Sequence, residues 1–285
     1  MKDGITRVTA LRAGEVDFAN LVPREHLERL ARDPQLQVFR GKDTQRILLF
    51  FNQRKPQFQD VRVRRAVLGY GIDRPAIVKT ALLGMAQPLW SFVPPGSRGH
   101  IDFGEQFPYA PDKARALLKE AGYDEKNPLR FTLMAHSAEA ALPTIATIMK
   151  TQLAQIGVEV TVEVLDRPVF LRRITRDRDW ELVIANTSAA IDPHAISRAI
   201  DTRVGSNVTN HADTHVDALI DRLRQAATEE DYLKLGQEFQ RYVVENMIST
   251  SVASFAFLQA ARSYVKGYEN LHGYKIRFET TWLDK

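Results

Sequence analysis

A run of short polar side chains follows an apolar segment in the second half of the chain. Residues 180–185 have the composition of a strand, and Asn186, Thr187 and Ser188 come directly after it. In α/β folds, ligands bind beyond the carboxyl ends of strands, where hydroxyl, amide and backbone N–H groups can hydrogen-bond to them. We therefore predict that these three residues line a ligand site. The alternative for these three residues is an ordinary loop. For Asp192 we predict the cap of a helix that begins at the following proline.

Two histidines, His211 and His215, have the spacing of a metal-binding pair on a helix. Asp213, between them, stands where an N-cap would precede the apolar positions of a helix over residues 214–227, and this places His211 outside the helix. No glutamate completes a zinc-peptidase motif. We therefore predict a helix cap here, and no catalytic metal at His194, His211 or His215.

The other residues that could do chemistry lack their partners. The carboxylate pairs Glu15–Asp17 and Asp177–Asp179 could do acid–base work, but both stand in segments typical of solvated turns. Ser188 has no G-x-S-x-G frame, and no glycine-rich phosphate loop is present. We predict a protein that is not an enzyme and has no cofactor.

Helical and strand patterns alternate around these residues, which predicts an α/β fold with a mainly parallel or mixed sheet. Strands are predicted over residues 36–39, 46–52, 130–135, 159–165, 180–185 and 249–258. Helices are predicted over residues 25–31, 60–69, 74–83, 112–122, 138–156, 168–175, 214–227 and 229–246. Eight prolines and glycines punctuate a connector over residues 87–111, where Trp90 and Phe92 require burial.

Composition excludes some classes of protein. The 285 residues are 44% hydrophobic and carry a formal charge of +4, with basic residues interleaved among acidic ones. A nucleic-acid-binding protein would have a clustered basic stripe, so we predict no nucleic-acid partner. The chain has no cysteine, no apolar run long enough to span a bilayer and no recognisable signal peptide.

The most informative segment covers residues 51–74. Asp60 and Asp73 stand at N-cap positions, each before a helical pattern. The first of these helices ends at Gly71. Its apolar positions recur at helical spacing and are Val63, Ala66, Val67 and Tyr70. The arginines of the same helix, Arg62, Arg64 and Arg65, are predicted to face away from the core.

This segment resembles the hallmark of the family 5 extracellular solute-binding proteins, the peptide- and nickel-type receptors of bacterial ABC importers. The sequence departs from the hallmark at Gln57, which precedes the phenylalanine, and at Tyr70–Gly71. Further segments resemble the family in the same order along the chain. They are residues 10–18, 83–88, 93–96, 112–123 and 152–158.

The resemblance implies a periplasmic-binding-protein-like type II lobe with a mixed sheet, plus an incomplete portion of the other lobe. We expect residues 1–44 to belong to the first lobe, 45–255 to form the second α/β lobe and 256–285 to return to the first. In the family, the segment at Gly14 lies well inside the mature receptor. We therefore expect that an N-terminal portion is lacking and that the incomplete lobe favours self-association.

The resemblance also implies a function. We expect the substrate-binding component of a bacterial ABC importer, periplasmic or membrane-associated outside the cell, with a peptide or small polar ligand and an ABC permease as partners. An aromatic near Phe255 faces the cleft in relatives, so Phe255 joins the predicted site. Ala189 stands where peptide-binding relatives often carry an acidic residue, which leaves the ligand class open. The alternative is a ligand-sensing regulatory module of the same fold that is not coupled to a permease.

Overall fold

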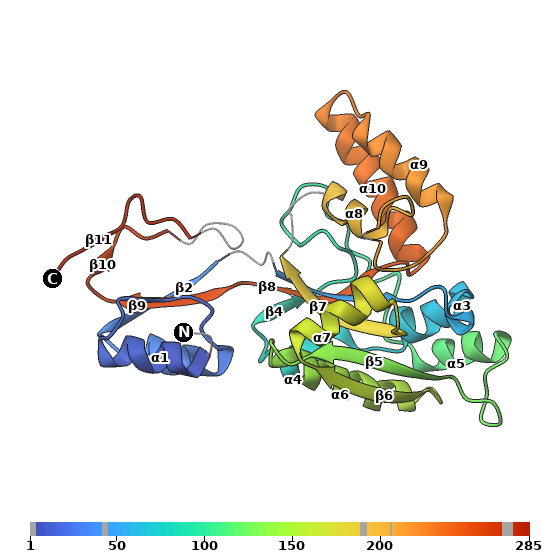
Figure 1. Ribbon diagram of the computed structural model, residues 1–285, viewed down its shortest axis with the longest axis horizontal. Helices are drawn as coiled ribbons and strands as arrows, with labels where there is room; N and C mark the ends of the chain where they lie inside the picture. The colour runs from blue at the N-terminus through green and yellow to red at the C-terminus, as the bar shows by residue number, and fades with distance from the viewer. Residues whose placement is uncertain (1–3, 42–44, 189–192, 206, 270–275) are drawn as a thin grey trace.

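Two β-sheets organise the chain, and each carries its own helices (Figure 1). The computed structural model describes residues 4–41, 45–188, 193–205, 207–269 and 276–285. The six-stranded sheet has the order β4-β8-β3-β7-β5-β6, and the three-stranded sheet has the order β1-β9-β2. A small hairpin, β10 with β11, lies beside the three-stranded sheet.

The six-stranded sheet is mixed, as predicted. Strand β5 pairs in parallel with β6 and β7, whereas β3 pairs antiparallel with β7 and β8, and β4 pairs antiparallel with β8. Its strands are β3 (Gln45–Phe51), β4 (Ala86–Pro88), β5 (Arg130–His136), β6 (Glu159–Leu165), β7 (Leu182–Ser188) and β8 (Thr250–Phe255). The chain therefore has the α/β class that the alternating pattern indicated.

Helices cover both faces of this sheet. On one face the odd-numbered side chains of β3 join the largest core cluster, together with residues of α3 (Val61–Arg64), the π-helical segment η3 (Arg65–Tyr70), α4 (Arg74–Ala81), α5 (Pro111–Glu120) and α6 (Ala141–Ala154). On the other face, Phe50 packs with α7 (Arg167–Arg172) and η4 (Arg173–Asp177). A further cluster joins α8 (Ser197–Ile200), α9 (Thr214–Arg224) and α10 (Glu229–Glu245), and α9 and α10 project from the body of the protein (Figure 1).

The three-stranded sheet is formed by segments from the N-terminal and C-terminal parts of the chain. Strand β9 (Leu258–Arg262) pairs antiparallel with β1 (Phe18–Ala19) and β2 (Leu36–Arg40). Helix α1 (Gly4–Ala13) and α2 (Leu27–Ala31) bury Leu11 and Leu30 in the same small core. The remaining elements are η1 (Arg24–His26), η2 (Pro56–Phe58), η5 (Pro193–Ile196), β10 (Val265–Lys266) and β11 (Trp282–Leu283).

The prediction of one strand over residues 249–258 is wrong. The chain forms β8 in the large sheet and then β9 in the small sheet, with only Ala256 and Phe257 between them. Both halves are extended and no glycine or proline stands between them, so local pattern could not separate them. Pairing with β3 on one side and with the distant β2 on the other makes the division.

Three predicted helix caps are confirmed. The carboxylates of Asp60, Asp73 and Asp213 accept hydrogen bonds from the backbone N–H groups of Arg62, Ala76 and His215, respectively. The predicted cap at Asp192 lies outside the described residues.

The prediction that all three hallmark arginines face away from the core is wrong for Arg64. Its side chain is buried and donates to the carbonyl oxygens of Phe58, Gln59 and Asn246. Arg74 is buried as well and donates to Leu68 O, Ser251 O and Thr250 Oγ1. Each guanidinium thus satisfies oxygens that burial would otherwise leave unpaired. Burial lowers the pKa of Arg64 to about 10 and that of Arg74 to about 9.

The connector over residues 87–111 packs onto the part of the protein built around the six-stranded sheet, as its aromatic residues required. Phe92 is fully buried against Phe239 of α10. Trp90 Nε1 donates to Phe107 O at 3.0 Å, and its ring lies over the Arg74 guanidinium. No helix in the described part of the chain is both long and apolar enough to cross a membrane.

Candidate ligand-binding site

The predicted site residues lie at one edge of the six-stranded sheet, where β7 and β8 end and β3 begins, near the small sheet (Figure 1). Two cross-strand rows form this edge. In one row, Gln45 pairs with Ser188 on β7 and with Phe255 on β8. In the other, Arg46 pairs with Thr187 and with Ser254. The ends of β7 and β8 are therefore held together by the first residues of β3.

Strand alternation places the predicted residues on two faces of the sheet. Residues directly opposite in an antiparallel pair share a face, and neighbours along a strand face opposite ways. Arg46 and Thr187 consequently lie on the face that carries Phe50 and α7. Asn186 lies on the face of Ile47, which also carries Phe255. Ser188 is placed by its backbone pairing alone, and Ala189 lies outside the described residues.

Phe255 is a core residue in this arrangement. Its side chain is 2% exposed and belongs to the main core cluster. The Arg24 guanidinium lies over the ring, 4.3 Å from its centroid. Arg24 belongs to η1, beside the small sheet, so this contact joins the two parts of the protein. Phe257 lies beyond the end of β8.

His136 supports the predicted residue Asn186 from the neighbouring strand. It ends β5, is 4% exposed, and its Nε2 lies 3.0 Å from Asn186 Oδ1. Burial lowers the pKa of His136, the hydrogen bond to Asn186 raises it, and the nearby Arg167 charge lowers it. The net direction is downward, so the imidazole is neutral at pH 7. Sequence reasoning missed this residue, although a histidine that ends an apolar run over residues 131–135 was a usable signal.

Arg46 and Gln45 were also missed. Gln45 is fully buried, and neither its Oε1 nor its Nε2 has a hydrogen-bond partner among the described residues. Arg46 is 3% exposed and donates from Nη1 to Phe92 O, whereas its Nε has no partner in the described structure. The signal was a polar pair placed directly before the apolar run of β3. Buried polar atoms without partners are uncommon and call for an explanation.

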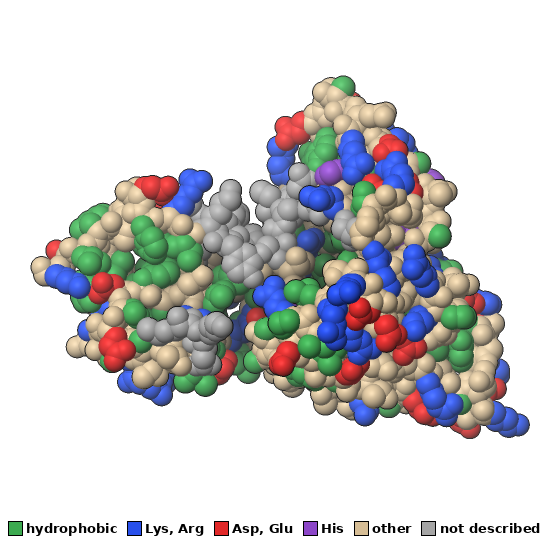
Figure 2. Space-filling model, viewed as in Figure 1, with side chains coloured by type: hydrophobic (Ala, Val, Ile, Leu, Met, Phe, Trp, Pro, Cys, Tyr) green, Lys and Arg blue, Asp and Glu red, His purple; other side chains and the backbone are tan. Residues whose placement is uncertain are grey.

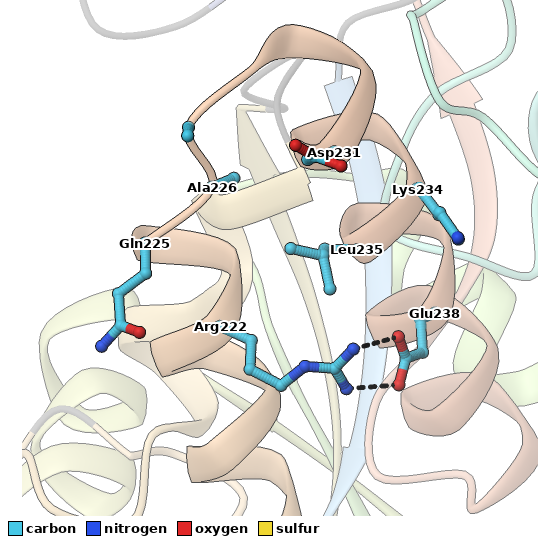
Figure 3. A pocket seen from close by; sticks show the side chains of 8 residues that line it. Arg222, Gln225, Ala226, Asp231, Lys234, Leu235 and Glu238 are labelled. Carbon is cyan, nitrogen blue, oxygen red and sulfur yellow. Dashed lines mark hydrogen bonds and ion pairs between the residues drawn. The ribbon is translucent and has the colours of Figure 1, made fainter.

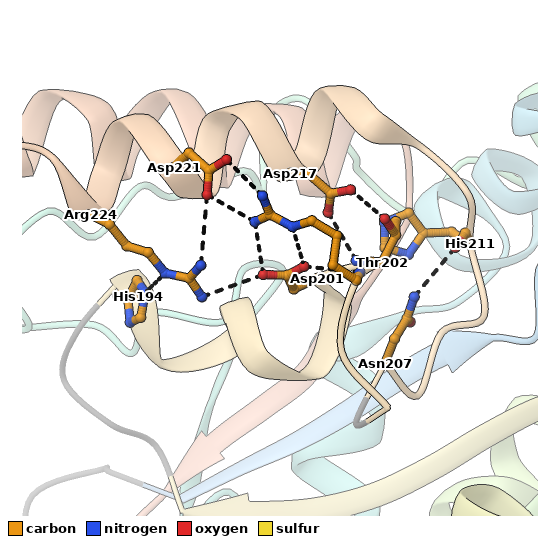
Figure 4. Close-up of polar contacts among 9 residues, drawn as sticks. His194, Asp201, Thr202, Asn207, His211, Asp217, Asp221 and Arg224 are labelled. Carbon is orange, nitrogen blue, oxygen red and sulfur yellow. Dashed lines mark hydrogen bonds and ion pairs between the residues drawn. The ribbon is translucent and has the colours of Figure 1, made fainter.

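The three histidines considered as metal ligands have separate surroundings, and Figure 4 shows those of His194 and His211. His194 Nε2 accepts from Arg224 Nε at 3.1 Å. His211 is buried with Nδ1 2.6 Å from Thr209 Oγ1, and the exposed His215 packs on the Tyr242 ring. Where the chain is described, no three His, Asp or Glu side chains come together as a metal site.

An ion network lies beside these histidines and joins α9 to the segment after α8 (Figure 4). Asp201 is buried and accepts from Arg203 at 2.9 Å and from Arg224 at 3.4 Å. Arg203 also pairs with Asp221 at 2.7 Å. The Arg203 hydrogen bond lowers the pKa of Asp201 to about 2. Each charge is offset by another, so the network holds α9 in place without a free group for a ligand.

A surface pocket of about 450 Å³ lies at the α9–α10 turn (Figure 3). Arg222 and Glu238 close one side with two hydrogen bonds of 2.6 and 3.0 Å. Lys234 and Asp231 lie at its other side. Arg222 and Glu238 in the pocket lining pair with each other, and none of the predicted site residues lines the pocket.

On the face of the molecule in Figure 2, basic and acidic side chains are interspersed rather than massed.

Comparison with known proteins supports the reading of the fold. The family described as "Bacterial extracellular solute-binding proteins, family 5 Middle" matches residues 1–207. The glutathione-binding protein GsiB of Escherichia coli (strain K12) is 34% identical over 164 residues, which are 58% of this chain and 31% of that protein. The chain therefore aligns with less than a third of this relative's length.

Solved structures match the chain over nearly all of its length. DppA from Helicobacter pylori, in complex with the peptide STSA, gives a TM-score of 0.87 at 23% identity over 100% of this chain and 56% of that one. AgaA from A. tumefaciens R10, in complex with agropinic acid, gives 0.86 at 25% identity over 100% and 60%. NikA from Staphylococcus aureus, in complex with Ni(L-His)2, gives 0.80 at 19% identity over 99% and 60%.

These matches agree with the order of elements and with the mixed sheet. The named relatives are described as binding proteins and not as enzymes. Since the family match covers most of the chain, this protein belongs to the bacterial extracellular solute-binding proteins of family 5.

Proposed function

We propose that this chain is part of the substrate-binding component of a bacterial ABC importer for peptides or similar small polar solutes. It would act outside the cytoplasmic membrane and deliver its solute to a membrane permease. The relatives support this class of solute, because their names record glutathione, a peptide, agropinic acid and a nickel–histidine complex.

One structural observation carries the proposal. Strand β8 ends at Phe255 in the large sheet and β9 begins at Leu258 in the small sheet, so a two-residue connection links the two parts. The ends of β7 and β8 lie at this junction. A solute that touches both parts is bound best when they close on it, and its binding shifts the population toward the closed form.

We propose the division into lobes on the same basis. Residues 1–44 and 256–285 would contribute to the first lobe, and residues 45–255 would form the second. In this division, η1 with Arg24 belongs to the first lobe, and the sheet edge with Asn186, Thr187, Ser188 and Phe255 belongs to the second. These four residues would line the cleft, with Phe255 reached when Arg24 moves off its ring.

Calorimetry of the whole chain against tri-alanine, Met-Leu and glutathione tests the proposal. We expect at least one of the three to bind saturably. Thr187→Val, which removes one hydroxyl at nearly constant volume, should weaken that binding about three- to tenfold. Thr175→Val is the matched control, because Thr175 is exposed on η4 and its hydroxyl donates to Leu171 O. Absence of binding across the panel, or equal weakening by the control, would contradict the proposal.

A further inference from the structure

We infer that Arg46 binds the carboxylate group of a small anionic solute. The inference rests on the proposed function, in which a solute enters the junction between the two sheets, and it adds the chemical class of one ligand group. It starts from the surroundings of the three buried arginines in the described structure, Arg46, Arg64 and Arg74.

Arg46 differs from the other two arginines in the number of hydrogen bonds that its guanidinium donates to the protein. Arg64 and Arg74 each donate three hydrogen bonds to protein oxygens. Arg46 donates to Phe92 O alone, its Nε has no acceptor, and none of the described carboxylates forms an ion pair with it. Burial alone lowers its pKa to about 10, with no opposing acidic charge. The group is still a cation at pH 7 and requires an anion that the described protein does not supply.

The neighbours of Arg46 are donors suited to a carboxylate. Its cross-strand partners on the same face are Thr187 and Ser254. Ser254 is fully buried, and its Oγ has no partner among the described residues. A guanidinium edge and a hydroxyl can together donate to the two oxygens of one carboxylate, whereas they offer no charge complement to an ammonium group.

The position of Arg46 fits a ligand contact better than a structural role. Arg46 lies in the first two rows of β3, beside the end of β7 where Asn186 and Thr187 were predicted to meet a ligand. Strand β8 leaves for the small sheet two residues after Ser254. Arg74 instead lies deep in the fold and donates three hydrogen bonds, although its Nη1 has no partner among the described residues.

The first test uses sodium acetate as the probe, with sodium chloride at matched ionic strength. We expect acetate, and not chloride, to shift the Arg46 Nε–H resonance of the whole chain saturably, with the Arg74 resonance unmoved. Acetate should also raise the melting temperature of the natural protein but not that of Arg46→Met. Absence of a saturable acetate shift, an equal chloride shift, or the same acetate effect on Arg46→Met would overturn the inference. The acetate titration of the Arg46 resonance is measured on the natural protein. It therefore tests the inference even if Arg46→Met folds poorly.

The second test separates this inference from the proposed function. If tri-alanine binds, its C-terminal amide and the Arg46→Met variant should each weaken binding about tenfold or more. Equal binding of the acid and the amide would overturn the inference while leaving a peptide-binding function intact. If neither peptide binds, the peptide function is what fails, and the acetate titration still decides the role of Arg46.

Discussion

Arg24 and Glu139 form an ion pair between the two parts of the protein. Arg24 Nη1 lies 3.5 Å from Glu139 Oε1, and the side chains are 14% and 27% exposed. Arg24 lies in η1, between β1 and β2 of the small sheet, whereas Glu139 follows β5 of the large sheet. The same guanidinium covers Phe255. One residue therefore ties the small-sheet part to a loop and to a strand end of the large-sheet part.

We predict that Arg24 and Glu139 couple energetically. A double-mutant cycle with Arg24→Gln and Glu139→Gln, measured by urea unfolding, should give an interaction of about 0.5–1.5 kcal/mol, because the pair is mostly screened from water. The exposed pair Arg32–Glu28, at 3.6 Å with both side chains more than three-quarters exposed, is the matched control and should give less. Equal coupling in the two cycles would mean that the Arg24 pair has no special role.

We predict that Gly71→Ala destabilises the protein by about 1–3 kcal/mol, since added atoms in a packed interior force the backbone to shift. A Cβ at Gly71 would lie 2.6 Å from Ala66 O, 2.8 Å from Ile156 Cδ1 and 2.9 Å from Val67 O. Chemical denaturation measures the change. Gly205→Ala is the control, because nothing lies within 4 Å of its Cβ position. A Gly71→Ala protein as stable as the control would contradict the close packing at the end of η3.

We predict that Asp201 stabilises the fold at neutral pH and loses this effect in acid. Its folded pKa, lowered to about 2 by the Arg203 hydrogen bond, lies below the ordinary value of 3.8. The contribution is therefore complete above about pH 4 and declines as pH falls toward 2. Asp201→Asn should cost about 2–4 kcal/mol at pH 7, because Asp201 is 1% exposed and its partners stay charged.

Unfolding of the natural and Asp201→Asn proteins between pH 2 and 7 checks this prediction. The two stability curves should converge as the carboxyl is protonated. Curves that remain parallel down to pH 2 would show that the ion network is not responsible for the difference.

We predict that Tyr242 titrates well above the ordinary tyrosine value of 10.0. Burial, followed by its 2.7 Å hydrogen bond to Asp213 Oδ2 and the Asp213 charge, raises its pKa to about 12. A raised phenol pKa adds stability that is complete below about pH 10 and is lost as pH rises toward 12. The ultraviolet difference titration between the natural protein and Tyr242→Phe should start above pH 11. A difference curve centred near pH 10 would contradict the buried geometry.

Local features of this protein were determined by the sequence alone. Asp60, Asp73 and Asp213 cap helices through bonds to N–H groups two or three residues away, so the neighbouring residues contain all the necessary information. Strand β6 has the predicted bounds, Glu159–Leu165, because alternation and a preceding glycine mark both of its ends within the segment itself. The family could be recognised from the ordered motifs for the same reason, since each motif is a short pattern that depends only on its own residues.

Long-range pairing decided the rest. Asn186 and Thr187 are neighbours in sequence, yet the pleat turns them to opposite faces, and only the pairing with β3 fixes which face each one takes. The split of residues 249–258 between two sheets depends on β2, more than 200 residues earlier in the chain. Arg46 is polar and basic, which locally favours exposure. Its burial arises because β3 lies in the middle of a sheet covered on both faces, a property that no segment of the chain carries by itself.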